Sequence, residues 1–242
     1  MASGTVYGIG VGPGDPELVT LKALRILRAA PIIAYPAPLA DGQLGESFAR
    51  SIVAEFLTGT QREIAIGVPM VAERFPAQEV FDRAAREIGD EVAVGQDVAV
   101  LCQGDPFFYG SFMYLFARLA VRFRVEIVPG VSSLTACAAA AGSPLAAREE
   151  TLAVIPATLD EAALERRLAG VEAAAIIKLG RHFAKVRDVL VRLGLAEQAH
   201  YVERASLPNQ RILKLSTVDA AAVPYFAMIL LRGAHSANEG ER

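Results

Sequence analysis

Residues 10–16 read Gly10-Val11-Gly12-Pro13-Gly14-Asp15-Pro16, and an apolar run at 6–11 leads into them. Two further turns also follow apolar runs: Gly104-Asp105-Pro106 follows 98–102, and Pro129-Gly130-Val131-Ser132-Ser133 follows 125–128. A strand that ends in a glycine-rich turn and leads into a helix leaves backbone N–H groups pointing into a crevice. In open α/β sheets the ligand binds at the carboxyl ends of the strands. Three turns in this position therefore predict one ligand site.

The rest of the chain indicates an α/β fold, because strand-like and helix-like runs alternate along it. In the first part we expect strands at 5–11, 31–35, 62–66, 98–102 and 124–128, and helices at 17–30, 46–57, 78–89, 111–120 and 132–141. This alternation predicts a parallel sheet with helices on both faces.

The pattern restarts after Gly142-Ser143-Pro144. Strands are expected at 152–155, 174–179, 200–204, 211–215 and 226–231, and helices at 160–168 and 183–193. The last three strands suggest an antiparallel part. We therefore predict two α/β domains, 1–142 and 143–242, with a parallel first sheet, a mixed second sheet and a cleft between the domains.

The first turn differs from two common phosphate-binding motifs. Pro13 stands where a dinucleotide fingerprint needs its third glycine, and the strand expected at 31–35 ends without an acidic residue for a ribose. No Gly-Lys-Ser/Thr follows, so the turn is not a P-loop. Asp15 suits the N-cap of the next helix, with Pro16 at its first position. The cap alone does not account for so many glycines.

Composition limits the class of protein further. The 242 residues are 53% hydrophobic with a net charge of −3, and no apolar run is long enough for a spanning helix. No secretory signal is recognisable at the start, so we expect a cytoplasmic protein without a membrane partner. The two cysteines, Cys102 and Cys137, form neither a disulfide framework nor a zinc site. Without a block of Lys or Arg, no nucleic-acid partner is expected.

The three turns together resemble the tetrapyrrole methylase family of S-adenosylmethionine (SAM)-dependent enzymes. The resemblance rests on 11–23, 102–115 and 129–133, with further matches at 150–157 and 178–181. Within the family, Gly104-Asp105-Pro106-Phe107-Phe108-Tyr109-Gly110-Ser111 is similar to the form found in precorrin-2 C20-methyltransferases of cobalamin synthesis. The resemblance implies conversion of precorrin-2 to precorrin-3A by methylation at C20, and a homodimer.

Other functions stay open at this point. One variant takes the cobalt-loaded substrate, cobalt-factor II, of the anaerobic pathway. Other members of the family methylate uroporphyrinogen or RNA, and the acidic net charge disfavours RNA. From a different class, the chain could be a non-catalytic module that only binds an adenosyl ligand or a tetrapyrrole.

The resemblance also implies the SAM contacts, and no metal is expected. They are Pro13, Gln103, Gly104, Asp105, Phe108, Ser132, Ser133, Leu179 and, less surely, Leu215. Asp105 could instead cap the helix after its turn, and Ser132 and Ser133 could cap theirs. In such a site, positioning of the two reactants supplies most of the rate, so a strong acid or base is not required.

The sequence leaves the group that receives the C20 proton open. Weak candidates are Tyr35, Glu46 and Tyr109. Family members that methylate uroporphyrinogen have an acidic residue after the tyrosine of the second strand, where this chain has Pro36, so that carboxylate has no counterpart here. His182 could face the cleft but is more often a structural residue at such a position. Cys102 is expected to be a small buried apolar residue.

Overall fold

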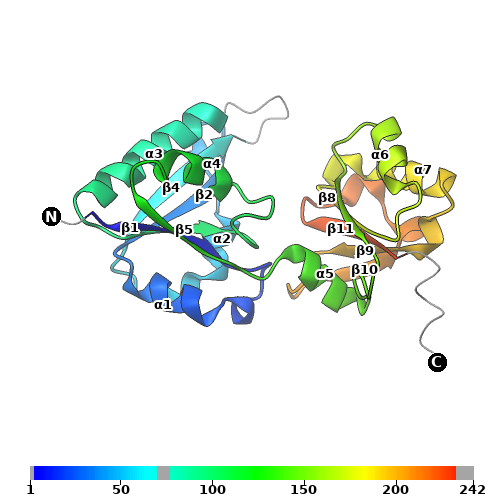
Figure 1. The fold of residues 1–242 in the computed structure, drawn as a ribbon, viewed down its shortest axis with the longest axis horizontal. Helices are drawn as coiled ribbons and strands as arrows, with labels where there is room; N and C mark the ends of the chain where they lie inside the picture. The colour runs from blue at the N-terminus through cyan, green and yellow to red at the C-terminus, as the bar shows by residue number, and fades with distance from the viewer. Residues whose placement is uncertain (1–2, 70–76, 233–242) are drawn as a thin grey trace. The chain divides into compact units, whose positions relative to one another are not determined.

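The computed structural model describes residues 3–69 and 77–232. The chain divides into two compact units, Met1–Ser132 and Ser133–Arg242 (Figure 1). Each unit has its own sheet and its own buried apolar core. Among the described residues no helix is both long and apolar enough to cross a membrane.

The first unit is built on a parallel sheet. Its elements in chain order are β1 Thr5–Gly10, η1 Pro16–Leu18, α1 Leu21–Ala29, β2 Ile32–Ala40, β3 Gln43–Leu44, α2 Phe48–Ile52, η2 Ala54–Phe56, β4 Arg62–Pro69, α3 Ala77–Ala93, β5 Val98–Cys102, α4 Phe112–Leu119 and β6 Arg124–Val128. The strand order is β3-β2-β5-β1-β6, and β4 pairs in parallel with β2. Only the short β3 pairs antiparallel within the described sheet. The predicted parallel sheet is confirmed.

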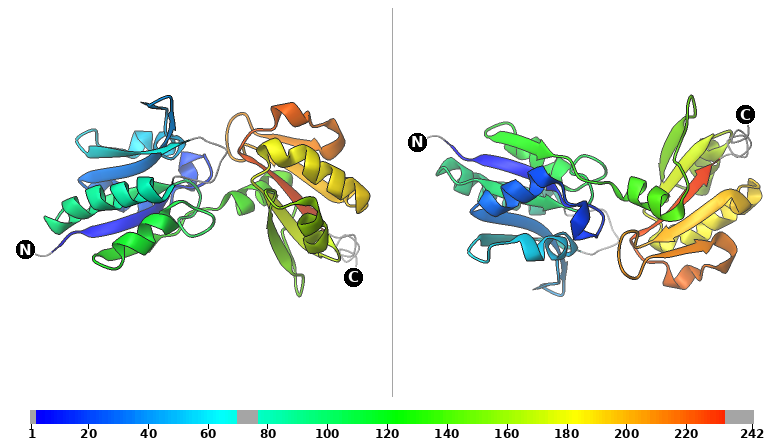
Figure 2. Two further views of the ribbon diagram at one scale, coloured as in Figure 1. Left: turned by 90° about the horizontal axis from the view of Figure 1, so that it is seen from above. Right: turned by 90° about the horizontal axis from the view of Figure 1, so that it is seen from below.

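Helices cover both faces of this sheet. On one face α1 and α2 pack on it through residues such as Leu27 and Ile52, and on the other α3 and α4 pack through residues such as Ile88 and Leu115 (Figures 1 and 2). The central strand β5 is buried at every position. A strand covered on both faces reads as a continuous apolar run, which is why the sequence located it well.

Two of the predicted helices are shorter than expected because the chain breaks them. The run expected at 17–30 is a short 3-10 turn, capped by Asp15 as predicted, and then α1. Between them the backbone is extended at Val19, and the Thr20 side chain caps α1 by accepting from the Ala23 N–H at 3.2 Å. The run expected at 46–57 is likewise α2 followed by η2.

The second unit contains a mixed sheet, as predicted. Its elements are α5 Ser133–Ala141, β7 Leu152–Pro156, α6 Glu161–Leu168, β8 Ala173–Ile177, η3 Gly180–His182, α7 Phe183–Arg192, η4 Ala196–Gln198, β9 Ala199–Glu203, β10 Arg211–Lys214, η5 Leu215–Thr217, η6 Ala220–Ala222 and β11 Ala227–Arg232. The strand order is β10-β9-β11-β8-β7, with β7 parallel to β8 and the other pairs antiparallel. Because β8 and β9 are both antiparallel to β11, the carboxyl ends of β7, β8 and β9 share one edge.

The unit boundary lies at Ser132–Ser133, whereas the sequence analysis placed it after Gly142. Helix α5 contacts β9 and β11, so it belongs to the second unit. On the other face of that sheet α6 and α7 enclose a core that includes Leu164, Phe183 and Ile229 (Figure 2). The Gly142-Ser143-Pro144 turn ends α5 instead of separating the units.

Candidate functional site

The first two glycine turns are joined by backbone hydrogen bonds. The Gly104 N–H donates to the Gly12 carbonyl at 2.8 Å, and the Gly12 N–H donates to the Gly104 carbonyl at 3.3 Å. The Val11 N–H also donates to the Cys102 carbonyl at 2.9 Å. β1 and β5 are neighbours in the sheet, so their turns meet directly beyond its carboxyl edge.

Asp105 ties the second turn to the third. Its Oδ1 accepts from the Phe107 N–H at 2.8 Å, and its Oδ2 accepts from the Gly130 N–H at 3.1 Å. Hydrogen bonds to a carboxylate are stronger than those between neutral groups. The three turns thus form one cluster, which we call the turn cluster: 10–16, 104–106 and 129–132.

The turn cluster depends on bare backbone at two crossing points. A Cβ on Gly130 would lie 2.2 Å from the Gly104 carbonyl oxygen, and a Cβ on Gly10 would lie 2.5 Å from the Gly130 nitrogen. Both neighbours are backbone atoms, which cannot rotate away as a side chain would. Gly104 differs: its φ is +66°, and a Cβ there would meet nothing within 4 Å. The backbone of the second turn therefore borders open space.

Five of the residues implied as SAM contacts lie in or next to the first two turns of the turn cluster. They are Pro13, Gln103, Gly104, Asp105 and Phe108. Pro13 and Gly104 are buried, and the other three are half-buried. Ser132 ends the first unit, and Ser133 is the first residue of α5 in the second.

The two remaining predicted contacts belong to the second unit. Leu179 follows β8 at the shared carboxyl edge, and its carbonyl accepts from the His182 N–H at 2.7 Å. Leu215 follows β10, which runs antiparallel to β9. Leu215 therefore lies towards the opposite edge, where Lys214 pairs with His200 at the start of β9. Because the two positions lie at opposite edges of the sheet, the structure does not bring them together. Both leucine side chains are buried.

Tyr35 on β2 is hydrogen-bonded to a neighbouring ion pair between Arg50 and Glu63. Its hydroxyl donates to Glu63 Oε2 at 2.7 Å, and Arg50 binds both oxygens of the same carboxylate at 2.6 and 2.7 Å. The Arg50 guanidinium lies 5.9 Å from the centre of the Tyr35 ring. Burial, followed by the Glu63 carboxylate, raises the pKa of Tyr35. A raised pKa disfavours the ionised tyrosine that would accept a proton, so Tyr35 is poorly suited to that role.

The other two candidates are more exposed. Tyr109 is 44% exposed, and its ring packs edge-to-face on Phe108 with centroids 5.2 Å apart. Its φ of +56° is unusual for a residue with a side chain, and such backbone clusters at functional sites. Glu46 is exposed in the loop before α2. Tyr109 alone of the three lies close in sequence to the turn cluster, just after the second turn.

Two further residues that the sequence singled out, Cys102 and His182, have pKa values shifted by burial. Cys102 is buried, as predicted, and burial raises the pKa of its thiol to about 11. His182 is half-buried in η3, and burial lowers its pKa, helped by Lys185 and Arg181. Within the described residues no group of three His, Cys, Asp or Glu side chains could hold a metal ion.

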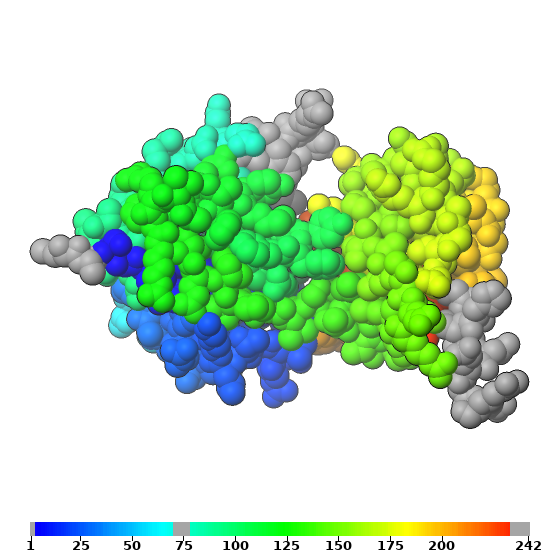
Figure 3. All heavy atoms as spheres, viewed as in Figure 1, coloured from blue at the N-terminus to red at the C-terminus, as the bar shows by residue number. Residues whose placement is uncertain are grey.

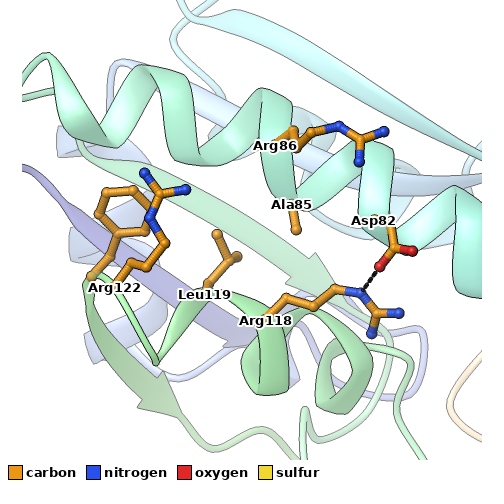
Figure 4. Close-up of a pocket in the computed structure, with 7 residues that line it drawn as sticks. Asp82, Ala85, Arg86, Arg118, Leu119 and Arg122 are labelled. Carbon is orange, nitrogen blue, oxygen red and sulfur yellow. Dashed lines mark hydrogen bonds and ion pairs between the residues drawn. The ribbon is translucent and has the colours of Figure 1, made fainter.

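A pocket of about 220 Å³ lies elsewhere in the first unit, between α3 and α4. It is lined by Asp82, Ala85, Arg86, Arg118, Leu119, Arg122 and Phe123 (Figure 4). Arg118 spans the two helices: it donates to Asp82 at 2.6 Å, to the Tyr114 carbonyl and to Gln78. The pocket shares no residue with the turn cluster and reaches Phe123, just before the start of β6. We interpret it as a helix–helix groove closed by an ion pair.

Sequence reasoning missed a buried charged cluster in the second unit. Glu203, at the carboxyl end of β9, accepts from Tyr201, Arg204 and Arg211. The usable signal was Arg211 at the start of the next strand-like run, where a hairpin places it beside Glu203. The sequence pattern suggests an antiparallel part there but does not show which strands pair.

A parallel α/β unit with glycine turns gathered at the carboxyl edge of its sheet is typical of an enzyme that binds a nucleoside-containing ligand. The family model for Tetrapyrrole (Corrin/Porphyrin) Methylases matches residues 5–221. The chain belongs to this family.

Three curated relatives narrow the comparison. The chain is 42% identical over 240 residues to the cobalamin biosynthesis protein CobIJ of Mycobacterium tuberculosis, covering 96% of this chain and 46% of the relative. It thus spans about half the length of that relative. It is 38% identical over 238 residues to the precorrin-2 C(20)-methyltransferase of Sinorhizobium sp, covering 95% of this chain and 96% of the relative. It is 34% identical over 232 residues to the cobalt-precorrin-2 C(20)-methyltransferase of Salmonella typhimurium, covering 95% and 96%.

A solved structure agrees with the fold. The uroporphyrin-III C-methyltransferase of Thermus thermophilus, complexed with S-adenosylhomocysteine, superposes with a TM-score of 0.67 at 27% identity. The match covers 97% of this chain and 100% of that one. The predicted two-domain α/β architecture is therefore confirmed as the architecture of this family.

Proposed function

We propose that this protein is a SAM-dependent C-methyltransferase that methylates precorrin-2 at C20 to give precorrin-3A in cobalamin biosynthesis. The single observation that supports this most is the 38% identity to a precorrin-2 C(20)-methyltransferase over nearly the full length of both chains. A second candidate takes the cobalt-loaded substrate, and the relative from Salmonella typhimurium favours it.

The turn cluster suits SAM as a co-substrate. Its crossing backbones leave Gly104 beside open space, and Pro13, Gln103, Asp105 and Phe108 lie around it. When bound, SAM supplies a methyl group on a sulfonium. The turns would hold the ligand through backbone groups that are already fixed by hydrogen bonds, so little reorganisation is needed on binding. Ser132 and Ser133 would complete the contacts after the third turn. Leu179 stays a proposed contact from the second unit, whereas Leu215, which lies towards the opposite edge of its sheet, does not.

In the reaction a bond would form between the methyl carbon of SAM and the meso carbon C20 as the sulfur–methyl bond breaks, which leaves S-adenosylhomocysteine, and C20 would then lose a proton. The electrons come from the reduced macrocycle, so the protein's main task is to hold the reactants in line. Tyr109 is the best placed of our candidates for handling the proton, because it is exposed and follows the second turn. We propose in addition a cytoplasmic homodimer without nucleic-acid, membrane or metal partners.

The test is anaerobic incubation of the purified protein with SAM and metal-free precorrin-2, followed by mass spectrometry of the pigment. One added methyl group, located at C20 by carbon-13 labelling, supports the proposal. Methylation of the cobalt-loaded substrate alone would move the protein to the second candidate. No product from either substrate would refute both.

A pair of variants links this activity to the turn cluster. Asp105→Asn replaces a carboxylate oxygen that accepts a backbone N–H with an amide that donates, so one of the two ties is lost. Turnover should fall at least tenfold. Asp219→Asn is the matched control, because Asp219 also accepts from the N–H two residues on, at 3.0 Å, but on an exposed cap in the second unit. Equal effects of the two substitutions would contradict a role for the turn cluster.

A further inference from the structure

Glu203 is a charged residue buried at the end of a strand. It is 3% exposed and lies at the carboxyl end of β9. Its Oε2 accepts from the Tyr201 hydroxyl at 2.5 Å, and its Oε1 accepts from Arg204 Nη1 at 3.1 Å and Arg211 Nη1 at 3.3 Å. A buried carboxylate is stable only when it is paired and hydrogen-bonded in this way.

The cluster carries more positive than negative charge. One carboxylate faces two guanidinium groups, and Tyr201 stays neutral because burial, followed by Glu203, raises its pKa. The guanidinium groups reach solvent, since the side chains of Arg204 and Arg211 are 33% and 58% exposed. Each uses Nη1 for Glu203, and a guanidinium has five N–H donors. The described structure gives neither side chain a second acidic partner.

The backbone around the cluster is unusual for residues with side chains. Arg204 and Ser206, which follow β9, have φ of +52° and +70°, and Lys178, which follows β8, has +59°. All three stand beyond the edge where β7, β8 and β9 end, together with Leu179. Left-handed backbone is unfavourable for residues with side chains, and it collects at ligand-binding sites. Ligands of α/β sheets bind at this edge.

We propose that Arg204 and Arg211 form a carboxylate-binding site at the carboxyl edge of the second unit, with Glu203 holding the two guanidinium groups side by side. Guanidinium groups bind carboxylates through paired, charge-assisted hydrogen bonds. The inference rests on the proposed function for its ligand: the carboxylate belongs either to a side chain of the tetrapyrrole or to the methionine part of SAM. Glu203 is a positioning residue in this site and does not touch the ligand.

Binding measurements on the full chain test the site without relying on turnover. The probes are S-adenosylhomocysteine, followed by calorimetry, and uroporphyrin III, a stable porphyrin with eight carboxylates, followed by its absorbance. Arg204→Gln should weaken binding of one probe at least tenfold. Arg211→Lys keeps the charge but loses the planar fork, so it should weaken the same probe by a smaller factor. Glu203→Gln should also weaken it, because the guanidinium groups lose their shared anchor.

Arg192→Gln is the matched control. Arg192 lies in the same unit and also forms ion pairs, with Glu161 and Glu165, but on the outer surface of α6 and α7. This substitution should leave both affinities unchanged. The probe that weakens identifies the source of the carboxylate: uroporphyrin III points to the substrate and S-adenosylhomocysteine to the cofactor.

Two results would overturn the inference. One is wild-type affinity for both probes in folded Arg204→Gln and Arg211→Lys variants, which leaves the cluster a structural ion pair. The other is that the wild-type protein binds neither probe. If the wild-type protein binds a probe through these arginines but does not methylate precorrin-2, the proposed function fails while the site stands. Should Arg204→Gln not fold, Arg211→Lys decides the outcome.

Discussion

Replacing Gly130 with alanine tests the crossing of the three turns. A Cβ there would lie 2.2 Å from the Gly104 carbonyl oxygen and 2.8 Å from the Gly10 backbone. Overpacking of this kind costs about 1–3 kcal/mol. The turns must also move apart, which breaks the 3.1 Å bond from the Gly130 N–H to Asp105, and a bond to a charged acceptor contributes about 1.5–3 kcal/mol. We expect a total destabilisation of the first unit of roughly 2.5–6 kcal/mol.

Two other glycines provide the comparison. Gly104→Ala meets no neighbour within 4 Å, so only its left-handed backbone, at φ +66°, counts against it, at about 1–2 kcal/mol. Gly142→Ala has the same kind of penalty at φ +58° and the same free space, but lies at the end of α5 in the second unit. The three substitutions thus separate steric crowding, backbone strain at the site and backbone strain elsewhere.

Urea unfolding of the full chain measures stability, and calorimetric titration with S-adenosylhomocysteine measures the cofactor site. Gly130→Ala should lower both strongly. Gly104→Ala should lower stability modestly and affinity more clearly, because its methyl group projects into the space next to the second turn. Gly142→Ala should lower stability alone. If Gly130→Ala matches Gly142→Ala in both measurements, the crossing of the turns is not what maintains the site.

Three more predictions concern residues outside the turn cluster. Arg50→Ala should lower the free energy of unfolding at neutral pH. Arg50 lowers the pKa of Glu63, so the contribution of the pair is present above the ordinary pKa of 4.5 and is lost as the pH falls through the lower native pKa. A loss of stability that does not shrink in acid would refute this. Burial raises the thiol pKa of Cys102 to about 11 and of Cys137 to about 12, so iodoacetamide should label neither quickly at pH 8 in the folded protein; rapid labelling would contradict their burial. Phe183→Ala should destabilise the second unit by about 3–5 kcal/mol, because the ring is fully buried against Tyr201. Hydrogen exchange should then rise in the second unit only, and an equal rise in both would show that the units do not fold separately.

Most of the fold was predictable because burial leaves a strong pattern in the sequence. β5 and β8 are buried at every position, and both appear as short apolar runs bounded by turn residues. The breaks at Val19 and Val53 were not predictable, since they lie inside runs of apolar and helix-forming residues. The two-residue strand β3 was also missed, because pairing of such length leaves no periodicity.

The site was predictable to the extent that backbone makes it. Glycines mark the places where one turn crosses another, and this signal located the turn cluster correctly within the first unit. Side-chain partners are a different matter. That Tyr35 donates to Glu63 depends on β2 lying beside β4, and that Glu203 collects two arginines depends on the β9–β10 hairpin. Contacts between residues distant in the sequence follow from the packed fold, so local pattern alone does not give them.

A surface segment of the first unit also combines features that the sequence pattern predicts with features that it does not. The stretch that carries α4 and β6 forms much of the face of that unit seen in Figure 3. It includes Met113, Tyr114 and Val121, all exposed, beside the buried Phe112 and Leu115. Helical spacing predicts which side chains of α4 face the sheet, whereas the exposed aromatic and aliphatic groups have no such rule.

The backbone crossing at Gly10, Gly104 and Gly130 has a consequence for how such a chain can diverge. Because the turns are joined largely by main-chain groups, most side chains around them can be exchanged over generations without loss of the junction. We expect substitutions to be tolerated least at Gly10 and Gly130, where a Cβ would meet backbone, and at Asp105, which ties the second turn to the third. A sequence can therefore drift to 27% identity with a relative and still superpose on it along nearly its whole length. What such a chain must keep is the spacing of the three turns and the glycines where they cross, more than the identity of the residues around them.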